Sequence, residues 1–338
     1  NECVNDGTAE SGHETRNADV LQHYVEAPGV DIERWEPTAD RASFVARLPG
    51  TDPTAPSLCL MGHTDVVPVT PDGWRHDPFG GELIKAGDGT DEVWGRGAVD
   101  MLNLTSSMAV VFRSLVDRGF RPKGDLLYFA VADEHPDAIR CDYLLTENGG
   151  LHSGPEGDRA ITVNVAEKGV AWRRLRVRGT PGHGSMPFGS DNALVVASKI
   201  VSRLADYQPA PRFHELWRGQ VESLDLPDDM KAAMVDEDTI DDLLADLPHP
   251  GAARFFQACT HTTFSPNVVR TVGRPKTNVI PDIVDIDVDI RTMPGDHTDE
   301  VTAHLREALG DDLFDRVEIE VLMDDPASTS RADTPLWD

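Results

Sequence analysis

The stretch Ser57–Pro68, with the sequence SLCLMGHTDVVP, places His63 and Asp65 directly after a short apolar run. A run of this kind predicts a buried β-strand over residues 58–62. In open α/β sheets ligands bind beyond the carboxyl ends of the strands, where this His and this Asp would lie. The carboxylate of a His-x-Asp pair can accept one imidazole N–H and leave the other ring nitrogen for a metal. The alternative is an ordinary polar His after a strand.

Composition limits the class of protein. A chain of 338 residues can hold two domains, and 39% hydrophobic with 27% charged residues is typical of a globular protein. The 59 acidic and 31 basic residues give a formal net charge of -28, which argues against nucleic acid and anionic membrane surfaces as partners. A strongly hydrated acidic surface, as in proteins adapted to salt, is the simpler interpretation.

The cysteines and the hydropathy favour a cytoplasmic protein. The four cysteines are scattered without a C-x-x-C pair, which is typical of a reduced compartment. No apolar segment is long enough to span a membrane, and the polar N-terminus does not have the pattern of a signal peptide. The sequence does not begin with Met, which is compatible with a removed leader.

Two further predicted strands also end in potential metal ligands. The continuous apolar run 126–132, LLYFAVA, is typical of a central parallel strand and leads into Glu134 and His135. Residues 142–146 predict another short strand, which Glu147 follows. A single acidic residue after a strand means little, but a repeated pattern of His and carboxylates at strand ends indicates a metal site.

Asp100 adds a fourth position of this kind. A Gly-Arg-Gly turn at residues 95–97 precedes it, and apolar residues at helical spacing predict a helix over residues 101–117. A carboxylate is favoured at a helix N-terminus, so a plain N-cap role is the alternative for Asp100. Because only His, Asp and Glu occupy the four positions, we interpret them as one metal site.

Two features of the sequence predict that this chain lacks parts of its first domain. If the strands at 126–132 and 142–146 are parallel neighbours, a crossover of about a dozen residues or more must join them. Residues 133–141, which include Pro136, are too few, so either this region is unusual or a segment is absent. Near the end, Thr334 and Pro335 predict the start of a helix that the chain does not continue, so we expect a C-terminal portion to be lacking.

From Lys168 the pattern changes to that of a second, smaller domain. Its predicted order β-α-β-β-α-β is that of a ferredoxin-like unit, interrupted by an acidic, helical insertion at about 212–260. The strands are expected at residues 170–178, 266–273, 282–291 and 317–321, and the helices from Ser190 or Asp191 to about 207 and over 298–309, closed by Gly310.

These residues resemble the M20 family of metallopeptidases, which includes carboxypeptidases, aminoacylases, and acetylornithine and succinyl-diaminopimelate deacylases. The matching motifs are MGHTDVVP (61–68), W-x-x-D-P-F (74–79), WGRGAVDM (94–101), ADE (132–134), LLTENGG (144–150), GTPGHGSMP (179–187), NVIP (278–281) and DIR (289–291). The resemblance implies an α/β fold: a zinc-peptidase-like mixed sheet with helices on both faces, plus an inserted ferredoxin-like lid or dimerisation domain. It implies catalytic residues 1–167, lid residues 168–324, and a truncated return to the catalytic domain at 325–338.

The resemblance also implies roles for individual residues. His63, Asp100 and Glu147 would be metal ligands, with Asp100 bridging two zinc ions per subunit, one of which Co2+ could replace. Asp65 would orient His63, and Glu134 would be the general base. In the lid domain, His183 would stabilise the oxyanion from the partner subunit, while Asn278 and Arg291 would hold the substrate's oxygen and α-carboxylate.

Two departures from the family pattern concern the second metal. The family has a second Glu after the general base, where this sequence has His135; that His either replaces the ligand or is the first residue beyond a missing crossover. The family's late His ligand has no counterpart after His304.

The resemblance implies a homodimeric zinc hydrolase that cleaves an amide next to a free carboxylate, in a small peptide or N-acyl amino acid. The alternative is a catalytically silent fragment or paralogue that keeps the fold and the dimer surface.

Overall fold

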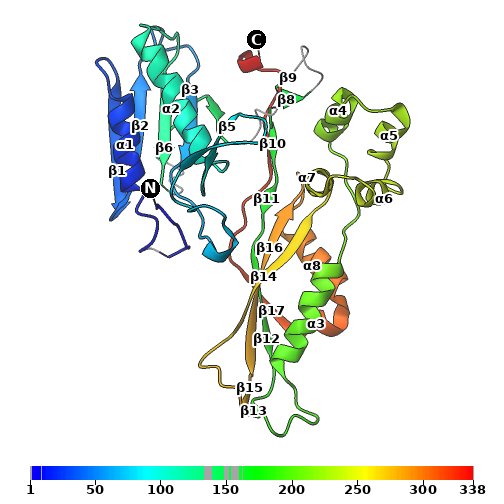
Figure 1. Ribbon diagram of the computed structural model, residues 1–338. Coiled ribbons are helices and arrows are strands. Elements are labelled where there is room, and N and C mark those ends of the chain that lie inside the picture. Colours follow the sequence, from blue (N-terminus) through cyan, green and yellow to red (C-terminus); the bar gives the residue numbers. More distant parts are fainter. Residues whose placement is uncertain are drawn as a thin grey trace. The chain divides into compact units, whose positions relative to one another are not determined.

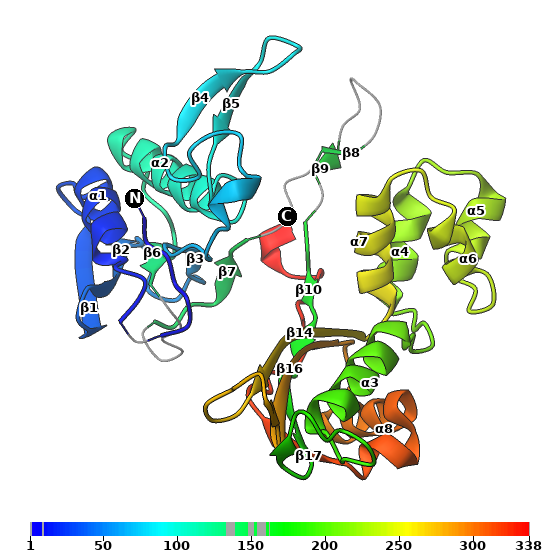
Figure 2. The same ribbon diagram turned by 60° about the horizontal axis from the view of Figure 1, so that its bottom comes forward.

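The computed structural model describes residues 2–8, 10–132, 139–147, 152–153, 160–161 and 163–337 (Figures 1 and 2). The chain forms two compact units, Asn1–Gly149 and Gly150–Asp338. The boundaries predicted from the sequence, at 167/168 and 324/325, stay predictions. Within the described ranges, no helix combines the length and the apolar character needed to cross a bilayer.

The first unit is built on a five-stranded mixed sheet with the order β1-β2-β6-β3-β7. Strand β2 is antiparallel to β1 and β6, whereas β3 is parallel to both β6 and β7. The expectation that 126–132 and 142–146 are direct neighbours was therefore wrong, because β3 lies between them. The carboxyl ends of β6, β3 and β7 nevertheless meet at one edge, since all three are parallel. The strands are β1 Asp31–Thr38, β2 Arg41–Leu48, β3 Leu58–His63, β6 Leu126–Val131 and β7 Tyr143–Leu145.

Strand β6 shows how the apolar run forms the core of this unit. All six of its residues are buried, and they alternate between the two faces of the sheet. Leu126, Tyr128 and Ala130 pack with helices α1 (Thr15–Val25) and α2 (Leu102–Asp117), whereas Leu127, Phe129 and Val131 join a second cluster on the other face. The mixed α/β class is confirmed. Both described helices of this unit contact one another and pack in the same cluster, so no described helix covers the second face.

Two peripheral elements complete the first unit. The residues before Trp94 form the antiparallel pair β4 (Glu82–Lys85) and β5 (Asp91–Trp94). Edge strand β1 was missed, because its residues are mostly exposed and lack the apolar alternation of a half-buried strand.

The second unit contains the predicted antiparallel sheet. Strands follow the order β11-β16-β12-β17, and β14 pairs with β16. Helices α3 and α8 pack on the apolar side chains of β12 and β16, in the predicted β-α-β-β-α-β order. The elements are β11 Gly169–Val170, β12 Arg173–Arg178, α3 Ala193–Asp206, β14 Thr263–Thr271, β16 Ile283–Thr292, α8 Thr298–Phe314 and β17 Val317–Val321.

The strict alternation in β16 separates the core from a charged face. Val284, Ile286, Val288 and Ile290 are buried in the helix-covered core. The aspartates between them pair with arginines of the neighbouring strand β12: Arg174 contacts Asp287 at 2.7 and 3.2 Å, and Arg176 contacts Asp285 at 2.7 and 2.8 Å. These bidentate pairs neutralise part of the acidic charge and match the cross-strand register.

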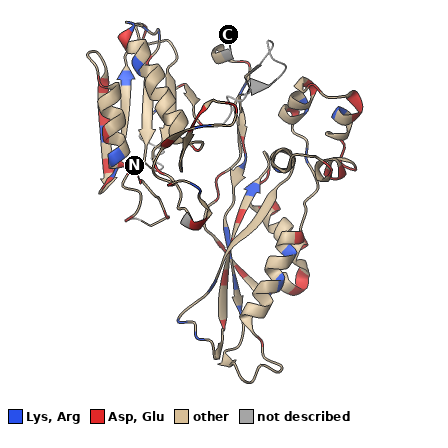
Figure 3. Cartoon of the chain, in the orientation of Figure 1, with Lys and Arg blue, Asp and Glu red and all other residues tan. Residues whose placement is uncertain are grey.

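The insertion is helical, as predicted, and acidic residues predominate on it (Figure 3). Its helices α4 (Glu215–Ser223), α5 (Asp228–Ala233), α6 (Ile240–Ala245) and α7 (Pro250–Thr260) enclose a small core of their own around Trp217.

One predicted helix end in this unit was wrong. Helix α3 is capped by Asn192, whose side chain accepts the Leu194 N–H at 2.9 Å, rather than by Ser190 or Asp191. The helix predicted to close at Gly310 does break there: Gly310 has a non-helical backbone conformation (φ 66°), and a second helical segment of α8 follows it to Phe314. The short elements are β8 His152–Ser153, β9 Ala160–Ile161, β10 Ala166–Glu167, β13 Gly182–His183, β15 Val279–Ile280, β18 Ser328–Thr329, η1 Pro71–Gly73 and η2 Pro335–Trp337.

Candidate metal centre

His63 is the last residue of β3, and close packing of α2 against this strand fixes its backbone. The Thr105 hydroxyl donates to the His63 carbonyl at 2.8 Å. Gly62 permits this approach, because a Cβ at that position would lie 2.4 Å from Thr105 Oγ1. The strand end and the helix start therefore form one rigid platform for the side chains beyond them.

The structure brings His63, Asp100 and Glu147 together at this platform. One donor atom from each lies within 4.8 Å of the others, and no second such group occurs among the residues that the structure describes. His63 Nε2 is 3.2 Å from Asp100 Oδ1 and 3.5 Å from Glu147 Oε2. His63 is at the end of β3, Asp100 lies just before α2 and Glu147 lies just after β7.

Asp100 is not a helix cap. The N-cap residue of α2 is Met101, and no side chain caps this helix. The peptide bond between Asp100 and Met101 is cis. The Asp100 side chain is 79% exposed, so the cluster is open toward solvent on this side.

The cluster fits a zinc ion on two grounds. Zinc ligands lie about 2.0–2.2 Å from the ion, so two donors at a tetrahedral angle are about 3.3–3.6 Å apart, close to the 3.2 and 3.5 Å found around His63 Nε2. Glu147 Oε2 is buried and has no hydrogen-bond partner within the described part of the chain. A buried carboxylate oxygen without a hydrogen bond is costly, and a bound cation would satisfy it.

Asp65 sets the orientation of the imidazole. Its Oδ1 lies 3.0 Å from His63 Nδ1, on the side of the ring away from the cluster. The backbone carbonyl of Asp65 is also 3.2 Å from this nitrogen. Both acceptors favour a proton on Nδ1, which leaves Nε2 to act as the metal ligand.

The electrostatics of the cluster favour a cation. The neighbouring carboxylates of Asp65 and Glu147 outweigh the effect of burial and raise the pKa of His63 to about 10. The contact with His63 in turn lowers the pKa of Glu147. Three carboxylates around one imidazole thus stabilise positive charge at this point, which a divalent ion supplies once the imidazole loses its proton.

The other predicted site residues either fall outside the described residues or belong to the second unit. Glu134 and His135 fall outside the described residues, so their roles stay predictions. His183 and Asn278 belong to the second unit, on the paired strand ends of β13 and β15, where the Gly184 N–H donates to the Asn278 carbonyl at 2.8 Å. The exposed His183 has its Nδ1 2.8 Å from Ser185 Oγ.

Arg291 is already held by neighbours within the second unit. Its Nε and Nη2 donate to the Asp289 carboxylate at 2.7 and 3.3 Å. Its guanidinium carbon also lies 5.9 Å from the ring centroid of Trp172. These contacts orient the guanidinium, and its side chain remains 42% exposed.

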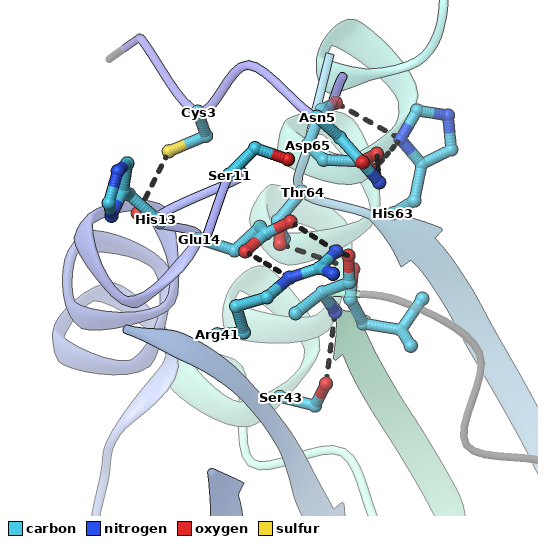
Figure 4. A network of polar contacts seen from close by, with 12 residues as sticks. Cys3, Asn5, Ser11, His13, Glu14, Arg41, Ser43, His63, Thr64 and Asp65 are labelled. Atoms are coloured by element: carbon cyan, nitrogen blue, oxygen red, sulfur yellow. Dashed lines mark hydrogen bonds and ion pairs between the residues drawn. The ribbon is translucent and has the colours of Figure 1, made fainter. Parts of the chain in front are cut away.

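One residue next to the cluster could not be predicted from the sequence. Asn5 donates from Nδ2 to Asp65 Oδ2 at 3.0 Å (Figure 4). It lies in a polar N-terminal stretch without periodicity or motif, so no local pattern could indicate this contact.

Comparisons with known proteins agree with this fold. Residues 165–316 match the family model of the M20 peptidase dimerisation domain. Aminoacylase-1 from Sus scrofa is 31% identical over 203 residues, which cover 56% of this chain and 47% of the relative. Succinyl-diaminopimelate desuccinylase from Rhodopseudomonas palustris is 30% identical over 206 residues, covering 56% and 51%. The chain thus spans about half the length of the curated relatives it matches.

Solved structures show the same fold along most of the chain. The M20 family metallo-carboxypeptidase Sso-CP2 from Sulfolobus solfataricus matches with a TM-score of 0.65 and 16% identity, over 98% of this chain and 78% of that one. The dipeptidase Dug1p from Saccharomyces cerevisiae matches with a TM-score of 0.64 and 16% identity, over 95% and 74%. At these identities the likeness concerns the fold alone.

The fold and the cluster define a two-unit α/β protein with a His–Asp–Glu group that could hold a metal ion at the edge of its first sheet. The family model, the curated relatives and the shared fold together support an M20 family peptidase, and the resemblance predicted from the motifs is confirmed. These homologues and structural neighbours are hydrolytic enzymes that act on peptide or amide bonds.

Proposed function

We propose that this protein is a zinc-dependent hydrolase that cleaves an amide bond next to a free carboxylate, in a small peptide or an N-acyl amino acid. The observation that carries the proposal is the donor spacing around His63 Nε2, together with the unsatisfied buried oxygen of Glu147. The names of the relatives, an aminoacylase and a desuccinylase among them, support an amide as the scissile bond.

His63, Asp100 and Glu147 would hold the first ion. A zinc ion in such a site polarises the carbonyl and makes a bound water acidic enough to react near neutral pH. Asp100 would also reach a second ion, zinc or Co2+, with His135 as a further candidate ligand. The exposed carboxylate of Asp100 is compatible with two ions, because each of its two oxygens could bind a different ion.

The remaining steps fall to side chains of this chain. Glu134 would take the proton of the attacking water and pass it to the leaving amine. His183, contributed by the partner subunit, would donate to the oxyanion. Asn278 and Arg291 would bind the substrate's oxygen and carboxylate; since Asp289 engages Nε and Nη2 of Arg291, a substrate carboxylate would bind through Nη1.

The assembly and compartment follow from separate observations. The match of residues 165–316 to a peptidase dimerisation domain supports a homodimer formed through the second unit. All four cysteines are free thiols, which supports the reducing cytoplasm as the compartment.

The test combines zinc content with turnover of a panel of N-acyl amino acids and dipeptides. We expect bound zinc and release of a free amino acid, both lost on chelation and restored by zinc. Stoichiometric zinc without turnover of any substrate would instead favour the catalytically silent fragment or paralogue. Absence of zinc binding would refute both the metal site and the hydrolase.

A further inference from the structure

The N-terminal segment runs alongside the chain that leaves β3 and is tied to it by main-chain bonds. The Asn5 N–H donates to the Val66 carbonyl at 2.8 Å, and the Val66 N–H donates to the Cys3 carbonyl at 2.8 Å. Val4 and Val66 form a parallel bridge between these bonds. The backbone alone therefore places Asn5 beside Asp65, whatever its side chain does.

The Asn5 side chain makes two further bonds, which fix the orientation of its amide. Its Oδ1 accepts the Gly7 N–H at 3.0 Å. Because a backbone N–H can only donate, this contact identifies the oxygen and turns the amide NH2 toward Asp65. Nδ2 then donates to Asp65 Oδ2 at 3.0 Å.

The two oxygens of Asp65 consequently have different partners. Oδ2 accepts from Asn5, and Oδ1 lies 3.0 Å from His63 Nδ1 (Figure 4). An unbroken series of polar contacts thus runs from the Gly7 N–H through Asn5 and Asp65 to His63, whose Nε2 faces Asp100 and Glu147. Removing the amide donor would free one oxygen of a carboxylate that is 19% exposed, and water would compete for it.

We propose that Asn5 is a positioning residue of the metal centre, acting through Asp65 on the orientation of His63. The inference rests on the proposed function in one respect, namely that His63 binds a metal. The amide holds Asp65 in the rotamer that accepts from Nδ1, so the lone pair of Nε2 stays directed at the ion. Partners of metal-ligating His residues typically contribute about 10- to 100-fold in metal affinity.

A purely structural role predicts a different result. The main-chain bonds that anchor Asn5 survive any substitution of its side chain, and the buried Glu14–Arg41 pair holds the adjoining α1 to the sheet independently. A variant that lacks only the amide donor should therefore keep its melting temperature and lose metal affinity. A structural residue would lose both together.

The experiment measures Co2+ affinity of the full chain from the visible absorbance of the bound ion, with chelator competition. Asn5→Ala removes both the donor to Asp65 and the acceptor for the Gly7 N–H. Asn5→Asp keeps the acceptor for the Gly7 N–H but places a negative charge against Asp65. We expect about 10-fold weaker binding for Asn5→Ala, about 100-fold weaker for Asn5→Asp, and an altered Co2+ spectrum at saturation for both.

Two controls make the result specific. Asn17→Ala removes an amide that donates to the neighbouring Thr64 backbone carbonyl at 2.6 Å, so it tests whether loss of any amide near Asp65 weakens binding; Co2+ affinity should stay close to wild type. In an Asp65→Ala background, Asn5→Ala should have no further effect, because the residue through which it acts is gone.

The outcomes separate this inference from the proposed function. Wild-type Co2+ affinity and spectrum in both Asn5 variants would overturn the positioning role while leaving the hydrolase intact. An undiminished effect of Asn5→Ala in the Asp65→Ala background would overturn the action through Asp65. A wild-type chain that binds neither Co2+ nor zinc would overturn both proposals. Both Asn5 variants are measured by Co2+ affinity and by the Co2+ spectrum. If one variant does not fold, the other still decides the outcome.

Discussion

The ion pair between Glu14 and Arg41 offers a sharp test of how the first unit is held together. Glu14 stands at the start of α1 and is fully buried, and its carboxylate accepts from Arg41 Nη2 at 2.9 Å and Nε at 3.2 Å. Arg41, on β2, is 12% exposed and also donates to the Ala132 carbonyl at 3.4 Å, at the end of β6 (Figure 4). The pair therefore joins α1 to two strands of the sheet.

Replacing Arg41 leaves Glu14 as a buried charge without the guanidinium that it contacts. Breaking such a pair costs about 3–5 kcal/mol. Arg41→Met should reach the upper end of that range, because it leaves a wholly buried carboxylate. Glu14→Gln should lie near the lower end, because its amide oxygen still accepts from the guanidinium. The double variant should cost less than the sum of the two, since the buried Glu14 charge is then removed together with Arg41.

Hydrogen exchange followed by mass spectrometry is the suitable assay, because a two-unit chain need not unfold in one step. A loss of about 3–5 kcal/mol corresponds to a fall of about 10²- to 10³-fold or more in the protection of β2 and β6. Peptides from β12 and β16 in the second unit serve as the internal control. Unchanged protection in β2 and β6, or an equal loss in both units, would refute the reasoning.

Three further predictions concern activity, pH and packing. Glu134→Gln should abolish turnover while zinc stays bound, because only the base is lost; undiminished rates would refute the general-base role. Burial lowers the pKa of Lys168 to about 8, so the folded chain binds fewer protons than the unfolded chain between pH 8 and the ordinary Lys value of about 10.5. Its contribution to stability should therefore rise through this window, by at most about 3 kcal/mol, and parallel unfolding profiles for wild type and Lys168→Met would contradict this. Gly62→Ala places a Cβ 2.4 Å from Thr105 Oγ1, so we expect a loss of about 1–3 kcal/mol in unfolding experiments and weaker Co2+ binding, whereas Gly73→Ala, which meets no atom within 4 Å, should change neither.

Much of the local structure could be predicted because it depends on short-range patterns. The continuous apolar run became the fully buried β6, and strict alternation became β16, whose two faces separate apolar from charged side chains. The helical spacing after Asp100 became α2, Leu102–Asp117. The same local reasoning indicated His63, Asp100 and Glu147 as candidate ligands, since His63 ends β3, Asp100 precedes α2 and Glu147 follows β7.

Pairing between distant segments was beyond such patterns. Nothing in residues 126–146 indicates that β3 lies between β6 and β7, because strand order depends on contacts far apart in the chain. Edge strand β1 lacks apolar alternation, and the cap at Asn192 was chosen among neighbouring polar residues by the final backbone path.

The sequence by itself determined which segments are buried and which side chains of metal-binding type stand at their ends, because burial and periodicity act within a few residues. Only the tertiary structure decided that Nε2 of His63 lies 3.2 Å from Asp100 and 3.5 Å from Glu147, and that Asn5 reaches Asp65. Those distances depend on parallel strands ending at one edge and on an N-terminal segment bound to the chain beyond β3. Such long-range geometry results from the packing of the whole unit, and no local stretch of sequence encodes it.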